Sequence, residues 1–213
     1  MNKNNRKHLL ILILLTMALV INSCKTKHKV GDLISLHDIE WRILEINRGK
    51  ALVISENILF ERQYHTSATS ITWANSSLRA YLNDEFYNSF SASDRNRIVE
   101  VNNINEDNQW IGTPGGLNTN DMIFLLSLAE VVKYFGDSGQ LANRPNNNTW
   151  WIDDQFNSNR IATFNGTASW WWLRSPGADS ISAYHVNYDG SIYSLVGNVR
   201  SSGGVRPALW LNL

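Results

Sequence analysis

Residues 170–213, WWWLRSPGADSISAYHVNYDGSIYSLVGNVRSSGGVRPALWLNL, join two unlike compositions in one stretch. The two ends are rich in tryptophan, arginine and proline, and the middle consists of Ser, Tyr, Asn, Gly, Asp and small aliphatic residues. Rigid ends around a permissive middle are typical of a binding surface on a scaffold, and the same polar residues dominate antibody binding loops. A surface hairpin with ordinary turn residues is the alternative interpretation.

We expect the ends of this block to be structural. The candidate structural residues are Trp172, Arg174, Pro176, Arg206, Pro207 and Trp210. Like Trp41 and Trp73, the tryptophans in apolar or alternating contexts are expected in the core. The two arginines are expected to hold carbonyl or carboxylate groups beneath surface loops, because a guanidinium offers a planar fork of donors. Trp150, Trp151 and Trp170 are less clearly core residues, and exposed rings of this kind stack on sugars or anchor protein contacts.

The N-terminus predicts export. Residues 1–23 have a basic head, an apolar run from Leu9 to Ile21 and a small residue at the end, as in a secretory signal peptide. The run is shorter than the roughly 20 residues of a spanning helix. Residues 21–24, INSC, resemble the lipobox of bacterial lipoproteins, which implies lipidation of Cys24, although Asn22 is unusual at its place. A plain secretory signal or an uncleaved anchor is the alternative. Lipidation would also account for a single cysteine, which has no partner for an intramolecular disulfide.

After the signal the chain has the size of one domain. We expect the lipidated cysteine and a basic tether at 24–30 and the domain at 31–213. The formal net charge is zero, with no basic face or acidic tail, so nucleic acid is not an expected partner. A lipid anchor would hold the domain at a membrane surface. The expected location is therefore the bacterial cell envelope, outside the cytoplasm.

The pattern of elements indicates an α+β fold. We expect a hairpin from strands at 33–36, 41–46 and 51–55, then a helix from Asn75 or Ser76 to Phe90 with one apolar face, and a short helix near Ser93. The polar segment 102–120 is long for a connection, which indicates a functional or a mobile loop. Met122 to Leu126 resembles a buried strand. Ser127 and Glu130 form a capping box for a helix that ends at Gly136. Further strands are expected at 183–187, 191–196 and 205–211.

The motifs resemble a known family. In chain order they are WRIL at 41–44, ALVIS at 51–55, TW at 72–73, LR at 78–79, LN at 82–83, FLLS at 124–127, WWLRSPG at 171–177 and VRPALW at 205–210. They resemble an uncharacterised bacterial domain of unknown function, found in secreted and lipid-anchored proteins, and the resemblance covers Gly31 to Leu213. The closing order of a Trp-rich strand, an Ala-x-x-Val strand, a glycine turn and a Val-Arg strand is similar to C-type-lectin-like domains. Formylglycine-generating-enzyme-like domains and retroelement-diversified proteins share that order.

Catalytic and metal sites have little support in the sequence. Formylglycine-generating enzymes act through cysteines, and the domain has none after Cys24. The five histidines lack the spacing of a helical metal site or a zinc hydrolase motif. Ser175 lacks the glycines of a hydrolase elbow. The acidic pairs at 106–107 and 153–154 are candidate calcium ligands, with solvated loop charge as the alternative. We therefore expect no catalytic residues, no metal site and no cofactor other than a possible calcium ion.

The middle of the C-terminal block carries the functional hypothesis. The candidate ligand-binding residues are Ser180, Ser182, Tyr184, His185, Asn187, Tyr188, Tyr193, Ser194, Arg200 and Ser201. The stretch 178–205 contains no Lys, Glu, Gln, Met or Trp. Every residue that is present can be encoded by a codon that ends in C, as adenine-directed diversification would produce. That hypothesis implies that some residues stay constant as a structural frame, namely Ala183, Val186, Asp189, Gly190, Gly197, Val199 and Gly204. It implies that the candidate ligand-binding residues vary, together with Ile181, Leu195 and Ser202. Chance depletion is the alternative.

The expected function is a lipid-anchored envelope module that binds an extracellular protein or glycan through 178–204. The alternatives are an enzyme that acts on envelope polymers and a structural envelope lipoprotein without a small ligand. The ligand, the membrane that holds the anchor and the oligomeric state are left open by the sequence.

Overall fold

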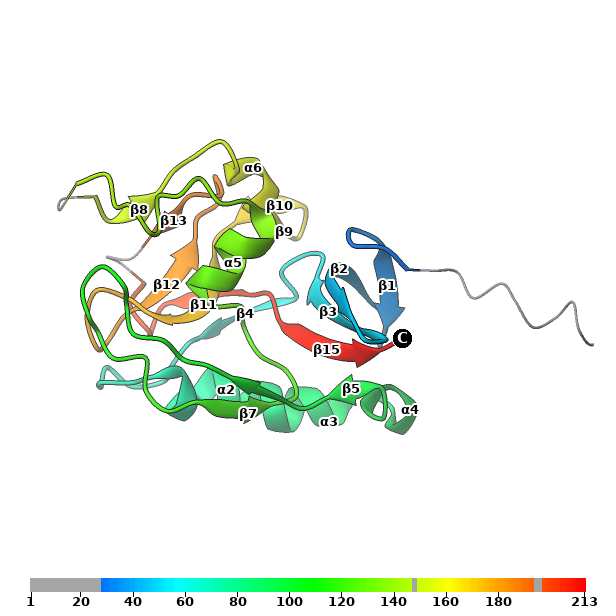
Figure 1. Ribbon diagram of the computed structural model, residues 1–213. Helices are drawn as coiled ribbons and strands as arrows, with labels where there is room; N and C mark the ends of the chain where they lie inside the picture. Colours follow the sequence, from blue (N-terminus) through cyan, green and yellow to red (C-terminus); the bar gives the residue numbers. More distant parts are fainter. Residues whose placement is uncertain (1–27, 147–148, 194–196) are drawn as a thin grey trace, which may run out of the picture.

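A computed structural model describes residues 28–146, 149–193 and 197–213. The expected signal peptide and Cys24 lie outside the described residues, as do Ser194 and Leu195. Figure 1 shows the described part as one β-rich body, with helices α2, α3 and α4 along one side and α5 among the strands of the other. The α+β class expected from the sequence is confirmed.

The first sheet joins the two ends of the domain. Its order is β1-β2-β3-β15-β5, and the bounds are β1 Leu33–Leu36, β2 Ile39–Asn47, β3 Lys50–Ser55, β15 Ala208–Asn212 and β5 Ile98–Val99. The predicted hairpin is confirmed. Arg48 and Gly49 have φ of 48° and 79°, as expected for a two-residue turn whose twist matches the strands. The last strand, β15, closes the sheet by pairing with β3 along its whole length.

The second sheet contains most of the C-terminal block. Its order is β4-β14-β11-β12-β13-β8, and the bounds are β4 Phe60–Gln63, β14 Ser202–Val205, β11 Trp171–Pro176, β12 Ala183–Val186, β13 Ile192–Tyr193 and β8 Trp151–Ile152. Only β11 and β14 are parallel. One face of this sheet is fully apolar and buried, because Trp171, Val186, Ile192 and Ile152 occupy paired positions in four neighbouring strands.

The helices begin where the sequence places them. Ser76 caps a continuous helical run made of α2 Ser77–Tyr81, the π-helical turn η2 Leu82–Phe86 and α3 Tyr87–Ser89, preceded by the 3-10 turn η1 Trp73–Asn75. The short helix α4 Ala92–Arg95 follows, capped by Ser91. Helix α5, Leu128–Phe135, has the predicted capping box and ends at Gly136. Helix α6 spans Asn157–Arg160. Two small sheets remain, β6 Val101–Asn103 with β7 Thr119–Asp121, and β9 Ala162–Phe164 with β10 Thr167–Ser169.

Two strand predictions were wrong. Residues 122–126 are largely buried but make only one bridge, from Phe124 to Ala208, because the segment turns to enter α5. The strand expected at 205–211 is divided between the two sheets, since β14 ends at Val205 and β15 begins at Ala208. Arg206 and Pro207 form the break, where proline has no N–H to donate to a ladder.

A buried ion pair secures the segment between α5 and the second sheet. Arg160 and Asp154 have side chains only 0% and 1% exposed, with 2.7 Å between Nη2 of Arg160 and Oδ1 of Asp154. Burial opposes ionisation of this carboxyl group. The hydrogen bonds from Arg160, Ser138 and the Phe156 N–H outweigh that effect, so the pKa of Asp154 lies below its usual value. The pair is supported by further hydrogen bonds from Arg160 to Asn157 and to the Gly136 and Gly190 carbonyl oxygens, although Nε of Arg160 has no partner among the described residues.

We predict that Asp154→Asn lowers the free energy of unfolding by about 3–5 kcal/mol, because it leaves the Arg160 guanidinium buried without its counter-charge. Chemical denaturation measures this loss. The matched control is Asp153→Asn at the exposed neighbouring position, which is expected to change stability by less than about 0.5 kcal/mol. Equal effects of the two substitutions would contradict a structural role for the buried pair.

Candidate functional site

The long polar loop is fixed to the second sheet. It joins β6 to β7 across residues 104–118. Asn108, which is buried, donates from Nδ2 to the carbonyl oxygens of Pro176 and Gly177 at 3.1 and 2.8 Å. Gly115 packs so tightly that a Cβ there would lie 2.2 Å from the Asn105 carbonyl oxygen. Of the two sequence interpretations of this loop, a functional loop fits these anchoring contacts better than a mobile one.

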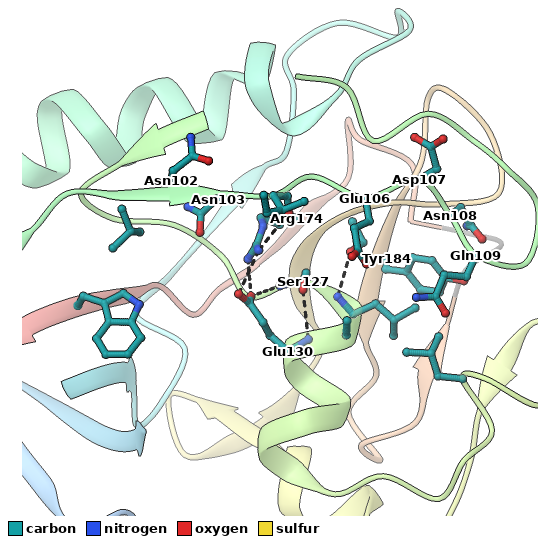
Figure 2. A pocket seen from close by; sticks show the side chains of 17 residues that line it. Asn102, Asn103, Glu106, Asp107, Asn108, Gln109, Ser127, Glu130, Arg174 and Tyr184 are labelled. Atoms are coloured by element: carbon teal, nitrogen blue, oxygen red, sulfur yellow. Dashed lines mark hydrogen bonds and ion pairs between the residues drawn. The ribbon is translucent and has the colours of Figure 1, made fainter. Parts of the chain in front are cut away.

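A cavity of about 300 Å³ lies beneath this loop. Figure 2 shows Arg174 and Glu130 facing each other within it, with Asn103 to one side and Tyr184 to the other. The lining comes from β6 and the loop, the start of α5, and strands β11, β12 and β15: Val101, Asn102, Asn103, Ile104, Glu106, Asp107, Asn108, Gln109, Ser127, Leu128, Ala129, Glu130, Leu141, Arg174, Ser175, Tyr184 and Trp210. A volume of this size is at the small end of ligand sites.

The cavity has a preorganised floor. The guanidinium of Arg174 forms a two-pronged ion pair with Glu130, with 3.1 Å between Nη2 and Oε1, and it also donates to the Leu125 carbonyl oxygen at 2.8 Å. Glu130 also accepts from the Ser127 N–H at 2.8 Å as part of the capping box. Ser175 accepts from the Leu128 N–H at 2.9 Å. The first turn of α5 and strand β11 are therefore locked together beneath the opening.

The rim is polar and partly free. Glu106 and Gln109 are exposed, and neither side chain makes a hydrogen bond to another described residue. Asp107 is exposed but accepts from the Gly115 N–H at 2.9 Å. The lining contains the carboxylates of Glu106, Asp107 and Glu130 and the one guanidinium of Arg174, a formal balance of 1 − 3 = −2. A neutral or cationic group is therefore favoured there over an anion.

The candidate ligand-binding residues are divided by the fold. Ser182, Tyr184 and His185 are buried, which corrects the expectation that the whole stretch forms one exposed surface. Tyr184 and His185 belong to strand β12, which lies between β11 and β13 in the second sheet, and Ser182 directly precedes it. The His185 ring is covered by the rings of Trp170 and Trp172. Tyr184 nevertheless lines the cavity. Ser180, Tyr188, Arg200 and Ser201 are exposed, Asn187 and Tyr193 are half-buried, and Ser194 lies outside the described residues.

The candidate structural residues lie mostly inside. Trp172, Arg174, Pro176, Arg206 and Pro207 are buried, whereas Trp210 is only half-buried and lines the cavity. Arg206 donates from Nε to the Ser55 carbonyl oxygen at 2.9 Å and from Nη2 to the Glu56 carbonyl oxygen at 3.0 Å. Burial lowers the pKa of Arg206 to about 10, so it stays charged at neutral pH. Both arginines thus make the carbonyl contacts expected of them.

The sequence did not predict that the cavity residues form one site. Glu106 was named only as a candidate calcium ligand and Glu130 only as part of a capping box, and both precede the C-terminal block by 40 residues or more. Two signals did point to them, namely the unusual length of the polar segment and the capping box at Ser127. Neither signal shows that both segments meet strands β11 and β12, because those contacts are non-local.

The described residues show few arrangements of side chains that could hold a metal ion. In the acidic pair 153–154, both carboxylate oxygens of Asp154 accept from Arg160 and are therefore already engaged. Among the described residues, no group of three or more His, Cys, Asp or Glu side chains is placed to hold a metal ion. No helix of the described chain has the length and apolarity to cross a membrane.

A row of rings crosses the second sheet on the face opposite its apolar side. Trp172, His185, Tyr193 and Trp151 are paired neighbours in β11, β12, β13 and β8. The row is buried at Trp172 and becomes 40% exposed at Trp151. Burial lowers the pKa of His185, and a hydrogen bond to Asn187 only partly opposes that effect.

We predict that His185 makes the domain less stable as the pH falls from about 7 to 5. The unfolded histidine takes up a proton near its ordinary pKa of about 6.5, whereas the folded one resists protonation, so stability rises with pH in this window. The measurement is the slope of unfolding free energy against pH for the wild type and for His185→Gln. A shallower slope is expected in the variant, whatever its absolute stability. Identical slopes would contradict the prediction.

Comparison with known proteins places the chain without giving it an activity. No curated protein and no solved structure matches the chain. One family model matches residues 48–213, described as a domain of unknown function, DUF6273. The match begins within the first hairpin and includes the loop, the cavity and the C-terminal block. The chain therefore belongs to the DUF6273 family.

Proposed function

We propose that this protein is a binding module of the bacterial cell envelope, anchored by lipid on Cys24, that recognises an extracellular glycan or protein. Its binding site is the cavity beneath the 104–118 loop rather than the whole surface of 178–204. The observation that carries the proposal is the unpaired rim of Glu106 and Gln109 above a floor fixed by Arg174 and Glu130. Preorganised polar groups around a small cavity favour specific binding.

Most carboxylates of the cavity lining are already engaged in contacts within the protein, which supports a binding function over a catalytic one. General acid and base work requires side chains that are free to exchange protons with a substrate. Glu130 is committed to Arg174 and to the Ser127 N–H, and Asp107 accepts from Gly115. The lining thus offers Glu106 as a free carboxylate but no second one to pair with it. A pair of free carboxylates is the chemistry that an enzyme acting on envelope polymers would need.

The C-terminal strands support the resemblance to C-type-lectin-like domains, which bind glycans or proteins. The Trp-rich strand β11, the Ala183–Val186 strand β12 and the strand β14 that ends at Val205 are neighbours in one sheet, in keeping with the resemblance. Diversification of 178–204 has narrower support, because Ser182, Tyr184 and His185 are buried. Free exchange of side chains at those three positions would disturb packing. The exposed positions alone, such as Tyr188 and Arg200, suit free variation.

We predict that glycan and peptide arrays probed with the chain from Lys25 onward give a ligand whose affinity depends on the cavity rim. Glu106→Ala and Gln109→Ala are each expected to weaken binding about tenfold, or about 1.4 kcal/mol, without a change in melting temperature. The matched control is Tyr188→Ala, which removes a 66% exposed ring of the C-terminal block outside the cavity. Loss of binding in the control alone would move the site to the exposed face of that block.

The anchor has a separate test. Cys24→Ala is expected to abolish incorporation of a labelled fatty acid and to release the protein from the membrane fraction, because the lipid supplies the attachment. Fractionation and labelling of wild type and variant in the bacterial host measure both effects. Labelling of the Cys24→Ala protein, or its retention on the membrane without label, would contradict the lipid anchor.

A further inference from the structure

A second cavity adjoins the first at Trp210. It also has a volume of about 300 Å³ and is lined by Asn47, Arg48, Lys50, Val99, Glu100, Val101 and Trp210. Val101 and Trp210 line both cavities, so the two hollows meet at a common wall. The wall is half-buried at both residues. The two cavities are therefore adjacent at Trp210, and a ligand longer than the first cavity can extend toward the second.

The backbone holds Trp210 firmly at this junction. In strand β15 it pairs with Leu52 of β3 on one side and with Val99 of β5 on the other. Its neighbours Leu209 and Leu211 are fully buried. The Trp210 side chain is half-buried and lines both cavities, so part of its ring is available to a ligand. An exposed aromatic face suits the apolar face of a sugar ring, and aromatic rings contribute large contact areas.

The two cavities have opposite charge. The first carries the formal balance of −2 described above. The second is lined by Arg48 and Lys50 against Glu100, a formal balance of 2 − 1 = +1, and all three side chains are exposed. A polymer of uniform charge would be repelled by one of these two cavities. The pair of cavities instead matches a ligand in which a neutral or cationic unit is followed by an anionic unit.

We propose that the site takes an oligosaccharide of at least two units, with a neutral or amino sugar in the first cavity and a carboxylate-bearing sugar in the second. The carboxylate lies against Arg48 and Lys50, and the connecting part of the chain crosses the Trp210 ring. This inference rests on the proposed function and gives it a ligand class, an extended heteroglycan with alternating neutral and acidic units.

Two probes of equal length test the inference on the full chain in detergent. One is the tetrasaccharide of alternating glucuronic acid and N-acetylglucosamine, and the other is the neutral chitin tetrasaccharide. Calorimetry is expected to give at least tenfold tighter binding of the acidic tetrasaccharide than of the chitin tetrasaccharide. The acidic tetrasaccharide is also expected to bind more tightly than the acidic disaccharide of glucuronic acid and N-acetylglucosamine. The preference is expected to shrink in 1 M salt, where exposed charges are screened beyond about 3 Å.

Variants separate the two cavities. Arg48→Gln with Lys50→Gln is expected to weaken the acidic tetrasaccharide much more than the chitin tetrasaccharide, so that the preference for the acidic probe is lost. Trp210→Phe is expected to weaken both tetrasaccharides and the acidic disaccharide several-fold, because Trp210 lines both cavities. Circular dichroism and melting temperature show that each variant is folded. Glu106→Ala serves as the reference for loss of the first cavity.

The outcomes distinguish this inference from the proposed function. Equal affinities for the two tetrasaccharides, or an acidic preference that survives loss of Arg48 and Lys50, overturns the second subsite, whereas sensitivity to Glu106→Ala still supports the first cavity. Binding of array peptides but of neither saccharide overturns the glycan inference and leaves a protein ligand. Array binding that is indifferent to Glu106 and Gln109 overturns the proposed cavity and this inference together.

Discussion

The guanidinium of Arg174 is the contact on which the arrangement of the site depends. It lies in β11 and is 4% exposed, and it reaches Glu130 in α5, the Leu125 carbonyl oxygen before that helix and the Ile104 carbonyl oxygen at the start of the loop. Its own backbone carbonyl accepts from the Tyr64 hydroxyl at 3.0 Å. The buried cation thereby joins segments that lie up to 70 residues apart, and the Tyr64 contact with its backbone brings in a segment 110 residues away. Because an unpaired buried charge is costly, these segments are held in one relative position.

The cavity follows from that arrangement. The loop cannot move away from β11, since Asn108 binds the Pro176 and Gly177 carbonyl oxygens, and the start of α5 is fixed by Ser175. The space left between them is bounded by Tyr184 on one side and by Trp210 at the other end. Rigid walls with a few free polar groups at the rim lower the ordering cost of binding. The walls come from separate segments of the chain, so the structural and the ligand-facing residues of the C-terminal block need not be neighbours in sequence.

The sequence predicted local structure well and assembly poorly. The hairpin turn at Arg48 and Gly49, the Ser76 cap and the capping box at Ser127 are short-range patterns, and all three are present. The strand expected at 122–126 failed because apolar runs that are buried by tertiary packing resemble strands. Tyr184 and His185 were expected at the surface because Tyr, Ser and Asn are common there. Their burial depends on tertiary packing, such as that of His185 against the rings of Trp170, Trp172 and Tyr193, which composition does not indicate.

By itself, the sequence determined the α+β class and membership of a family of unknown function. The export signal at residues 1–23 and the division of 170–213 into scaffold ends and a permissive middle stay predictions. Those properties depend on residue type and short spacing. Only the tertiary structure decided that the loop at 104–118, the start of α5 and strand β11 surround one cavity, and that Trp210 lies between two hollows of opposite charge. The reason is physical, since burial and ion pairing across distant segments are set by packing and not by neighbours along the chain.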